Sequence, residues 1–447
     1  MEFELTKEFR DLFQRAIDEK DDAFIRRSLE HVNPADISAL LYEFSADAAK
    51  WVLDLLPPDI QSEVVNHLDP DIRKRNLAVY PPEAIASFFN RLQSDDTADI
   101  LHELPVKIRE EILASLDPEL RSQVTELLRY EPHVAGGLME KELIKARIHW
   151  SVVRCVEEIR KQAENVHKFY QVYVVDENDQ LLGKVALQDL IISDARKHVA
   201  DIYEADIVSV QTYQEQDDVV GIMKKYDLES VPVVNVQNQL VGRITIDDIV
   251  DVITEQAEEE RQIMAGITED IEEDDSVWRN TRARLPWLVI GIIGGLLNAR
   301  FMGLFEAELS RVAAIAFFIP LIQATGGNVG IQSSSLVVQS LGNTAFVDVG
   351  LWKRLGRVFS VALLNGFVLA TLVIVLNVLL FDEVRLSMVV SIALFSVIVF
   401  ASLVGTITPL LLNRVGLNPA LASGPFITTT NDLLGLTIYF LTVHIML

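Results

Sequence analysis

Long apolar stretches dominate the last third of the sequence, whereas residues 1–280 mix apolar and charged positions at short spacing. A helix rises about 1.5 Å per residue and must cross about 30 Å of hydrocarbon, so about 20 apolar residues can span a membrane. Five stretches meet this requirement and predict a transmembrane domain of five helices over residues 281–447. Their predicted bounds are about 285–305, 311–339, 356–381, 386–412 and 417–446.

Charged residues beside these stretches predict their orientation. Basic side chains precede the first span, separate the second from the third and separate the fourth from the fifth: Arg279, Arg282, Arg284, Lys353, Arg354, Arg357 and Arg414. The positive-inside rule therefore places the N-terminal part in the cytoplasm and the C-terminus outside. The start of the chain lacks a leader pattern, so we expect a multi-pass protein of the cytoplasmic (inner) membrane. A single cysteine, Cys155, fits a reducing cytosol.

Negative charge is concentrated in the predicted cytoplasmic part. The chain carries 39 basic and 65 acidic residues, a net charge of −26. Residues 285–447 contain seven basic and six acidic side chains, which leaves 32 basic and 59 acidic ones, a net charge of −27, in residues 1–284. Such a field repels nucleic acid and attracts cations. We therefore expect cations as ligands and no nucleic-acid partner.

One internal repeat predicts a helical N domain. Residues 56–72 recur as residues 104–120, 48 positions later, and both copies are short amphipathic segments punctuated by proline. A period in this range, with Asp-Pro or Leu-Pro at the helix starts, is typical of a solenoid of stacked helical hairpins. We assign this all-α superhelix to residues 1–130.

A second repeat predicts an α/β module. Residues 173–191 match residues 232–250 at an offset of 59, and each copy reads as a strand, a polar turn, a second strand with glycine and an acidic N-cap that opens a helix. The pattern resembles the CBS domain, which occurs in tandem pairs. We assign the pair to residues 131–256, with copies at about 138–200 and 201–256. The resemblance implies adenine nucleotides or metal ions as ligands.

An acidic segment joins this pair to the membrane. Between Glu255 and Asp275 there are ten acidic residues and one basic residue, and we assign an acidic connecting (plug) helix to residues 257–280. Its charges should repel the acidic end of the second CBS copy, Asp247, Asp248 and Asp251. A divalent cation would relieve this repulsion, and Mg²⁺ prefers such oxygen ligands. An ordinary acidic linker is the alternative, and composition does not decide between the two.

The last span has an acidic residue at its centre. Asp432 shares a predicted helix face with Gly424, Thr428 and Gly435. A charged side chain at this depth costs about 2.5–3.5 kcal/mol on insertion scales. No Lys or Arg follows Asn418, so we interpret Asp432 as a cation site. An ion pair with an arginine of another span is the alternative.

The second span has an unusual composition for a membrane helix. It contains a proline, three glycines and two amides: Pro320, Gly326, Gly327, Asn328, Gly330 and Gln332. Proline removes a helix donor and glycine weakens a helix, and free carbonyls are tolerated at this depth only against protein or water. The span is therefore predicted to be a broken helix opposite Asp432 across a pore. Close helix packing through the glycines is the alternative.

The motif at 319–334, the run 418–432 and the bridge 130–139 together resemble the MgtE family of magnesium transporters. The order of helical N domain, CBS pair, acidic helix and five spans also matches, so the resemblance covers essentially the whole chain. It implies a homodimeric, Mg²⁺-selective channel with its pore on the dimer axis. Asp432 of each subunit would face the hydrated ion in that pore.

The resemblance also implies roles for other residues. The pore-lining candidates are Gly326, Gly327, Asn328, Gln332, Gly424 and Thr428. Cytosolic Mg²⁺ is expected to hold the pore shut by binding acidic residues, with candidates Asp227, Asp247, Asp248, Asp251, Glu255, Glu258 and Glu259. ATP is a further candidate ligand of the CBS pair.

Three other functions compete with this hypothesis. A gradient-coupled divalent cation exchanger would share the acidic pore but require a driving ion. A membrane-anchored sensor without transport would leave Asp432 unexplained. An enzyme is disfavoured because the sequence contains no P-loop, no Gly-x-Ser-x-Gly motif and no metal-hydrolase histidine spacing.

Overall fold

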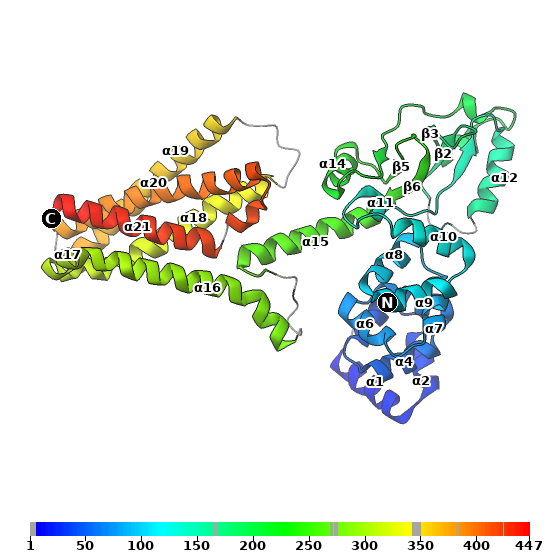
Figure 1. Cartoon of the computed structure of the whole chain (residues 1–447), viewed down its shortest axis with the longest axis horizontal. Helices are drawn as coiled ribbons and strands as arrows, with labels where there is room; N and C mark the ends of the chain where they lie inside the picture. Colours follow the sequence, from blue (N-terminus) through cyan, green and yellow to red (C-terminus); the bar gives the residue numbers. More distant parts are fainter. Residues whose placement is uncertain are drawn as a thin grey trace. The chain divides into compact units, whose positions relative to one another are not determined.

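The structure is a computed structural model of the 447-residue chain. It describes residues 6–163, 166, 169–268, 271, 276–341, 350–381, 384–422 and 424–447. The chain divides into two compact units, Met1–Val252 and Ile253–Leu447. Figure 1 follows them by colour, from a blue and cyan helical stack through two small sheets in green tones to a bundle of long helices that ends in red.

Short helices build the N-terminal part of the first unit in two rows. In one row α3 packs on α5, α5 on α7 and α7 on α9, and in the other α2 packs on α4, α4 on α6, α6 on α8 and α8 on α10. Within each row, a helix buries apolar side chains against the next helix of that row. The bounds are α1 Lys7–Glu19, α2 Asp22–Leu29, α3 Pro34–Leu41, α4 Ala46–Leu55, α5 Pro58–Asn66, α6 Pro70–Leu77, α7 Pro82–Phe89, α8 Ser94–Glu103, α9 Val106–Ser115 and α10 Pro118–Leu127.

The structural repeat of this stack is one helical hairpin. Helices α3, α5, α7 and α9 begin at positions 34, 58, 82 and 106, and their partners α4, α6, α8 and α10 begin at positions 46, 70, 94 and 118. The 48-residue sequence repeat therefore spans two hairpins. Proline stands in the first turn of α3, α5, α6, α7 and α10, where its missing N–H would have no partner within the helix.

Two similar three-stranded sheets follow. In each sheet the first strand is parallel to the second and the second is antiparallel to the third, in the orders β1-β2-β3 and β4-β5-β6. Both sheets shift register at equivalent positions, Val174/Val175 and Val233/Val234, so the 59-residue repeat is structural. The bounds are α11 Ala135–Leu138, β1 Lys145–Arg147, α12 Val152–Gln162, β2 Gln171–Val175, β3 Leu181–Ala186, α13 Leu187–Ile192, β4 Val210–Gln211, α14 Gln216–Tyr226, β5 Ser230–Val234, β6 Leu240–Thr245 and α15 Ile246–Ala265.

The acidic residues after β3 and β6 are not helix N-caps, contrary to the prediction. Ala186 is the N-cap of α13 and makes no side-chain capping bond. Asp248 lies in the first turn of α15, where its Oδ2 accepts hydrogen bonds from the Thr245 N–H and hydroxyl, both at 2.9 Å. Asp248 therefore lies within the helix, with its carboxylate held near the helix start.

Helix α15 continues beyond the last sheet and ends earlier than the predicted connecting helix. Gly266 follows Ala265 with a φ of +80°, a left-handed conformation that favours glycine and ends the helix. The segment predicted as one helix over 257–280 therefore contains the end of α15 and the start of α16, Val277–Met302. Other residues of that segment, 269, 270 and 272–275, lie outside the described residues.

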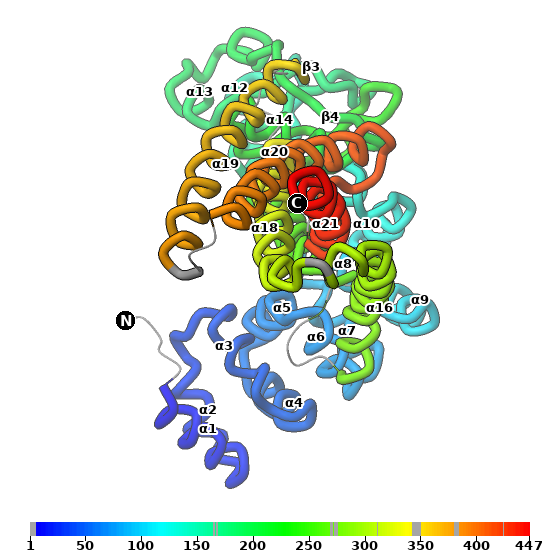
Figure 2. Tube along the Cα trace, turned by 90° about the vertical axis from the view of Figure 1, so that its left-hand side faces the viewer, coloured from blue at the N-terminus to red at the C-terminus, as the bar shows by residue number. Residues whose placement is uncertain are grey.

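Within the described residues, five apolar helical segments of the second unit are long enough to span a membrane, as predicted. They are Val277–Ser310, Ala313–Leu341, Leu351–Leu379, Val384–Val415 and Pro419–Met446. Helix α20 packs against α18, α19 and α21, and α16 packs on α21 (Figure 2). The helix bounds are α17 Glu306–Arg311, α18 Ile319–Leu341, α19 Leu351–Phe381, α20 Val384–Val415 and α21 Pro425–Met446.

The second span, predicted to be a broken helix, changes from a 3₁₀ helix, Ala313–Phe318, to the α-helix α18 at Ile319, and α18 then continues past its glycines without a break. Pro320 is its second residue, where a missing N–H costs no intrahelical bond. The glycines instead allow close packing. A Cβ on Gly330 would clash with the Asn431 side chain of α21, and a Cβ on Gly405 of α20 would lie 2.5 Å from the Gly330 carbonyl oxygen. Small residues thus let α18, α20 and α21 approach closely.

Candidate ion sites

The predicted cation ligand, Asp432, lies two turns into α21 and at the centre of the last span. Asp432 is partly exposed in this single chain, and within the described residues no side chain makes an ion pair or hydrogen bond with it. An ion pair between Asp432 and an arginine of another span, the alternative to a cation site, is therefore not found among the described residues. Gly327 of α18 brings its backbone against this face, because a Cβ at that position would lie 4.0 Å from Asp432 Oδ1 and 3.3 Å from Thr428 Cγ2. Gly327, Thr428 and Asp432 thus form one small group.

The other candidates on α18 lie on different sides of the helix. Gly326 faces the interior of the bundle, where a Cβ would lie 3.0 Å from Val397 Cγ1. Asn328 and Gln332 are one helical turn apart and exposed in the single chain. The structure therefore does not bring Gly326, Asn328 and Gln332 into the group around Asp432.

The start of α21 meets the end of α15. Gly424 precedes α21 with a φ of +60°, and a Cβ there would clash with the carbonyl oxygen of Met264. Gly266 packs on the first residue of α21, since its Cβ would lie 3.0 Å from Pro425 Cγ. The C-terminal end of the acidic helix α15 therefore covers the N-terminal end of the helix that carries the candidate ion ligand.

The sequence offers no prediction for Asn431, the neighbour of Asp432. The Asn431 side chain is fully buried, and both of its polar atoms lack a hydrogen-bond partner in the part of the chain that the structure describes. Leaving a buried polar group unpaired costs about 1–3 kcal/mol. The Asn-Asp pair in an apolar span is the signal that could have identified it. Asn431 places a strongly polar amide between α18 and α21, next to the candidate ion ligand.

A second acidic site involves α8 and the start of α15. Burial raises the pKa of Asp95 well above its usual range, and the neighbouring carboxylate of Asp248 adds to the rise. Burial also raises the pKa of Asp96, against the lowering effects of Asn66 and Arg73, while Asp251 adds to the rise. Carboxylates of two helices that are far apart in the sequence therefore share one crowded region.

Some of the predicted regulatory residues lie in this crowded region of α8 and α15, and the others lie further along α15 or at the end of α14. Asp247, Asp248 and Asp251 lie on the first two turns of α15, in the crowded region. Asp227 is the exposed C-cap of α14 with a φ of +50°. The remaining predicted residues are exposed beyond Val252 on α15: Glu255, Glu258 and Glu259. The α8 carboxylates are not among the predicted residues, although the acidic run Asp95, Asp96 and Asp99 in a helix start is a visible signal.

We expect the metal-free protein to lose stability as the pH rises from about 4 to about 8. Burial raises the pKa of Glu140 from 4.5 to about 8 against the lowering effect of Arg243, and burial raises that of Asp248 from 3.8 to about 6. Between the pKa of a carboxyl in the unfolded chain and its pKa in the folded protein, the folded state binds more protons. This proton binding stabilises the folded state at low pH, and the stabilisation is lost as the pH rises through the folded pKa.

The measurement of this pH dependence is the thermal-unfolding midpoint of the full-length protein in EDTA at about pH 5 and about pH 8. Saturating Mg²⁺ is the control, and it should flatten the trend because a bound cation replaces the protons. A midpoint that climbs with pH in EDTA would contradict the expectation.

Family models match consecutive parts of the chain. The MgtE intracellular N domain matches residues 32–133, and the CBS domain matches residues 135–195 and 199–255. The MgtE divalent cation transporter model matches residues 319–442. The predicted fold class is therefore confirmed: a helical N domain, a tandem CBS pair and a transmembrane helical domain.

Individual relatives extend the match over nearly the whole chain. The chain is 35% identical over 443 residues to the magnesium transporter MgtE of Thermus thermophilus, covering 97% of each. It is 32% identical over 350 residues to MgtE of Enterococcus faecalis, covering 71% of this chain and 70% of that one. The crystal structure of the cytosolic domain of the Mg²⁺ channel MgtE in complex with ATP matches at 35% identity and a TM-score of 0.52, over 54% of this chain and 99% of that one. The chain belongs to the MgtE family of magnesium transporters.

Proposed function

We propose that this family member is a Mg²⁺-selective channel that imports magnesium as a homodimer, with its pore on the dimer axis. The observation that carries the proposal is Asp432, a carboxylate at the centre of the last span with no ion-pair partner among the described residues. An uncompensated charge at this depth is expensive, so a cation pathway is its best physical explanation. Two such carboxylates repel each other until a divalent ion lies between them.

The group around Asp432 suits a hydrated ion. Mg²⁺ gives up its water reluctantly and is held by one or two carboxylates through a retained water shell. Gly327 leaves space beside the carboxylate, since its missing side chain would lie 4.0 Å from Asp432 Oδ1. Selection of Mg²⁺ through its water shell is therefore part of the proposal. The N-terminus is proposed to be cytoplasmic and the C-terminus outside, in the cytoplasmic (inner) membrane.

Closure by cytosolic Mg²⁺ is the second part of the proposal. The carboxylates of α8 and α15 raise one another's pKa values, so a divalent cation among them would stabilise their close approach. The far end of α15 lies against the start of α21 at Gly266 and Gly424. Moving a two-state gate from 1% to 99% closed requires about 5.5 kcal/mol of differential binding, which several ions can supply together.

ATP at the CBS pair is a further proposed ligand. The support is a relative's cytosolic domain, 35% identical, whose crystal structure is in complex with ATP. Binding of ATP to the purified full-length protein tests this point directly.

The channel proposal is tested by Mg²⁺ flux into proteoliposomes without a Na⁺ or proton gradient. We expect flux when Mg²⁺ on the cytosolic face is low and inhibition when it is raised to about millimolar levels, because occupied regulatory sites favour the closed state. Flux that requires a Na⁺ or proton gradient would instead identify an exchanger. Flux that does not change with the cytosolic Mg²⁺ concentration would refute only the proposed closure by cytosolic Mg²⁺.

A further inference from the structure

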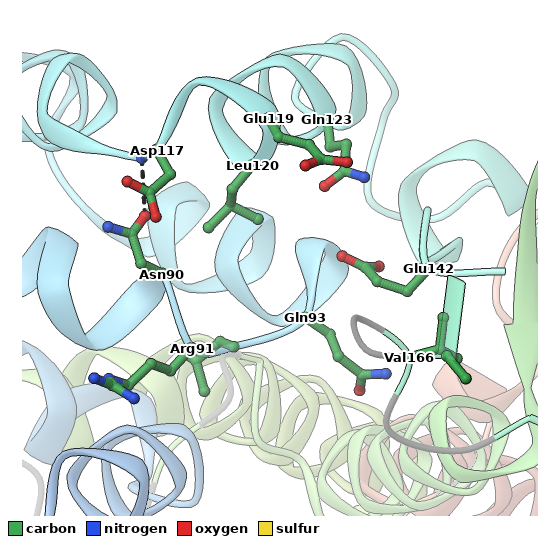
Figure 3. Close-up of a pocket in the computed structure, with 11 residues that line it drawn as sticks. Asn90, Arg91, Gln93, Asp117, Glu119, Leu120, Gln123, Glu142 and Val166 are labelled. Atoms are coloured by element: carbon green, nitrogen blue, oxygen red, sulfur yellow. Dashed lines mark hydrogen bonds between the residues drawn. The ribbon is translucent and has the colours of Figure 1, made fainter. Parts of the chain in front are cut away.

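The Asn431 amide is a buried polar group that no hydrogen bond in the described part of the chain satisfies. Amides elsewhere lie where water reaches them. Asn90, Gln93 and Gln123, for example, are partly exposed and line a cavity of about 570 Å³ in the first unit (Figure 3). Asn431 is 0% exposed and lies in a membrane span, so bulk water does not reach it. An unpaired amide in such a place calls for a physical explanation.

Gly330 of α18 leaves the space that this amide occupies. A Cβ at Gly330 would overlap Asn431 Nδ2 and would lie 3.0 Å from Asn431 Cγ. On another side Gly330 meets α20, where a Cβ on Gly405 would lie 2.5 Å from the Gly330 carbonyl oxygen. The backbone of Gly330 is therefore held between two helices, and it cannot yield to α21 without displacing α20. The Asn431 amide is seated against a fixed surface.

Asn431 lies in the line of contact between α18 and α21. Gly330 faces Asn431, and one turn further along α21 a Cβ on Gly435 would lie 3.5 Å from Ile322 Cγ2. The contacts move back along α18 as they move forward along α21, so the two helices are antiparallel. Asp432 follows Asn431 directly and lies about 100° further round the helix axis. The rotation of α21 that seats Asn431 against Gly330 therefore also sets the direction of the Asp432 carboxylate.

A small rotation of α21 would move this carboxylate appreciably. A helix with its side chains is about 10–12 Å across, so the carboxylate lies about 5–6 Å from the axis, and a rotation of about 20° displaces it by about 2 Å. In the proposed dimer, symmetry repeats the displacement, so the separation of the two carboxylates changes by up to about 4 Å. Mg²⁺ demands near-ideal octahedral geometry and keeps several waters, so a site that selects it is sensitive to such a change.

We propose that Asn431 is a positioning residue, which fixes the rotation of α21 and thereby the spacing of the Asp432 carboxylates around a hydrated divalent cation. A flat amide packs against Gly330 more closely than a branched aliphatic side chain of similar size. This role rests on the proposed function, because it assigns to Asn431 a part in the selection of Mg²⁺ at Asp432. Locally unfavourable groups of this kind are concentrated at functional sites.

Uptake of Mg²⁺ and of Ca²⁺ into proteoliposomes, each at the same concentration, tests the positioning role. Asn431→Ala keeps the charge of Asp432 but lets α21 turn, so the ratio of Mg²⁺ uptake to Ca²⁺ uptake should fall by about 10-fold or more. A misplacement of about 1 Å can cost about 100-fold at a site that requires a defined geometry.

Asn377→Ala is the matched control for this measurement. Asn377 is also a buried asparagine of a span, and its Nδ2 lacks a hydrogen-bond partner among the described residues. It belongs to α19, which packs on α20. Asn377→Ala removes the same atoms as Asn431→Ala and should leave the ratio of Mg²⁺ uptake to Ca²⁺ uptake unchanged.

A double substitution supplies a second readout that does not require ion flux. Gly330→Ala alone adds a methyl group that overlaps Asn431 Nδ2, so the thermal-unfolding midpoint should fall by at least about 2 °C. In the Asn431→Ala background the same methyl group occupies the space that the amide vacated, so the fall should be less than half as large. If Gly330→Ala does not fold alone, folding of the double variant would equally support the contact.

An unchanged ratio of Mg²⁺ uptake to Ca²⁺ uptake in Asn431→Ala would overturn the proposal. So would an equal fall of the midpoint on Gly330→Ala in both backgrounds, or a ratio that drops as far in Asn377→Ala as in Asn431→Ala. The channel proposal fails on a different result, namely wild-type protein that transports no Mg²⁺ without a Na⁺ or proton gradient. The midpoint comparison would still measure the contact between Asn431 and Gly330 in that case.

Discussion

Replacing Asp432 by alanine is expected to abolish Mg²⁺ flux through the reconstituted protein. A carboxylate about 5 Å from a divalent ion contributes about 2 kcal/mol at the dielectric constant of water and about 7 kcal/mol at an effective value near 20. Flux should therefore fall by at least about 15-fold. The measurement is uptake into proteoliposomes that contain a Mg²⁺-sensitive dye, with no other ion gradient.

Two variants control this experiment. Asp432→Glu keeps the charge and should retain part of the flux. Glu306→Gln removes one exposed carboxylate from α17 in the same unit and should leave the flux unchanged. Full flux in Asp432→Ala would move the ion pathway away from α21.

The second large effect is expected for Asp248→Asn, which should make Mg²⁺ flux less sensitive to inhibition by cytosolic Mg²⁺. Asp248 lies in the crowded region of α8 and α15, where burial and its neighbours Asp96 and Asp247 raise its pKa to about 6 against the hydrogen bonds from Thr245. Removing its charge removes both repulsion and a ligand. Because coupling free energies are typically about 1–3 kcal/mol, the half-inhibiting Mg²⁺ concentration should rise about 5-fold or more.

Asp227→Asn is the informative comparison for Asp248→Asn. Asp227 is also a predicted regulatory ligand, but it is the exposed C-cap of α14. We expect a smaller shift for Asp227→Asn than for Asp248→Asn, and flux at low cytosolic Mg²⁺ should be normal in both. An equal shift in both variants would show that the region of α8 and α15 is not the principal sensor.

The broad architecture can be predicted because its signals are local. The apolar spans, the proline-marked helix starts and the 59-residue repeat all depend on neighbouring residues. The predicted period of the N domain is twice the structural one because alternate hairpins match each other more closely in sequence than adjacent ones. The second span changes from a 3₁₀ helix to an α-helix next to Pro320, which stands in the first turn of α18 and displaces no hydrogen bond there, but the glycines that follow do not break α18.

The candidate sites are harder to predict because they join residues distant in sequence. Asp248 and Asp251 can be identified from their own acidic cluster. The proximity of Asp95 to Glu140 cannot be predicted in this way, since it depends on how α8 packs beside the segment after α11. Asn431 escapes prediction for a similar reason: its burial depends on the approach of Gly330 from another helix.

The two-row arrangement of α2 to α10 determines how far the destabilising effect of a substitution spreads through the N domain. Each helix packs mainly on the helix two places along the chain, so the stack behaves as a quasi-one-dimensional array of nearest-neighbour contacts. A defect in the first hairpin must pass through several interfaces before it reaches α8. The outer hairpins can therefore unfold locally while the end of the stack that carries α8 keeps its shape, so that local stability falls off along the stack towards the N-terminus.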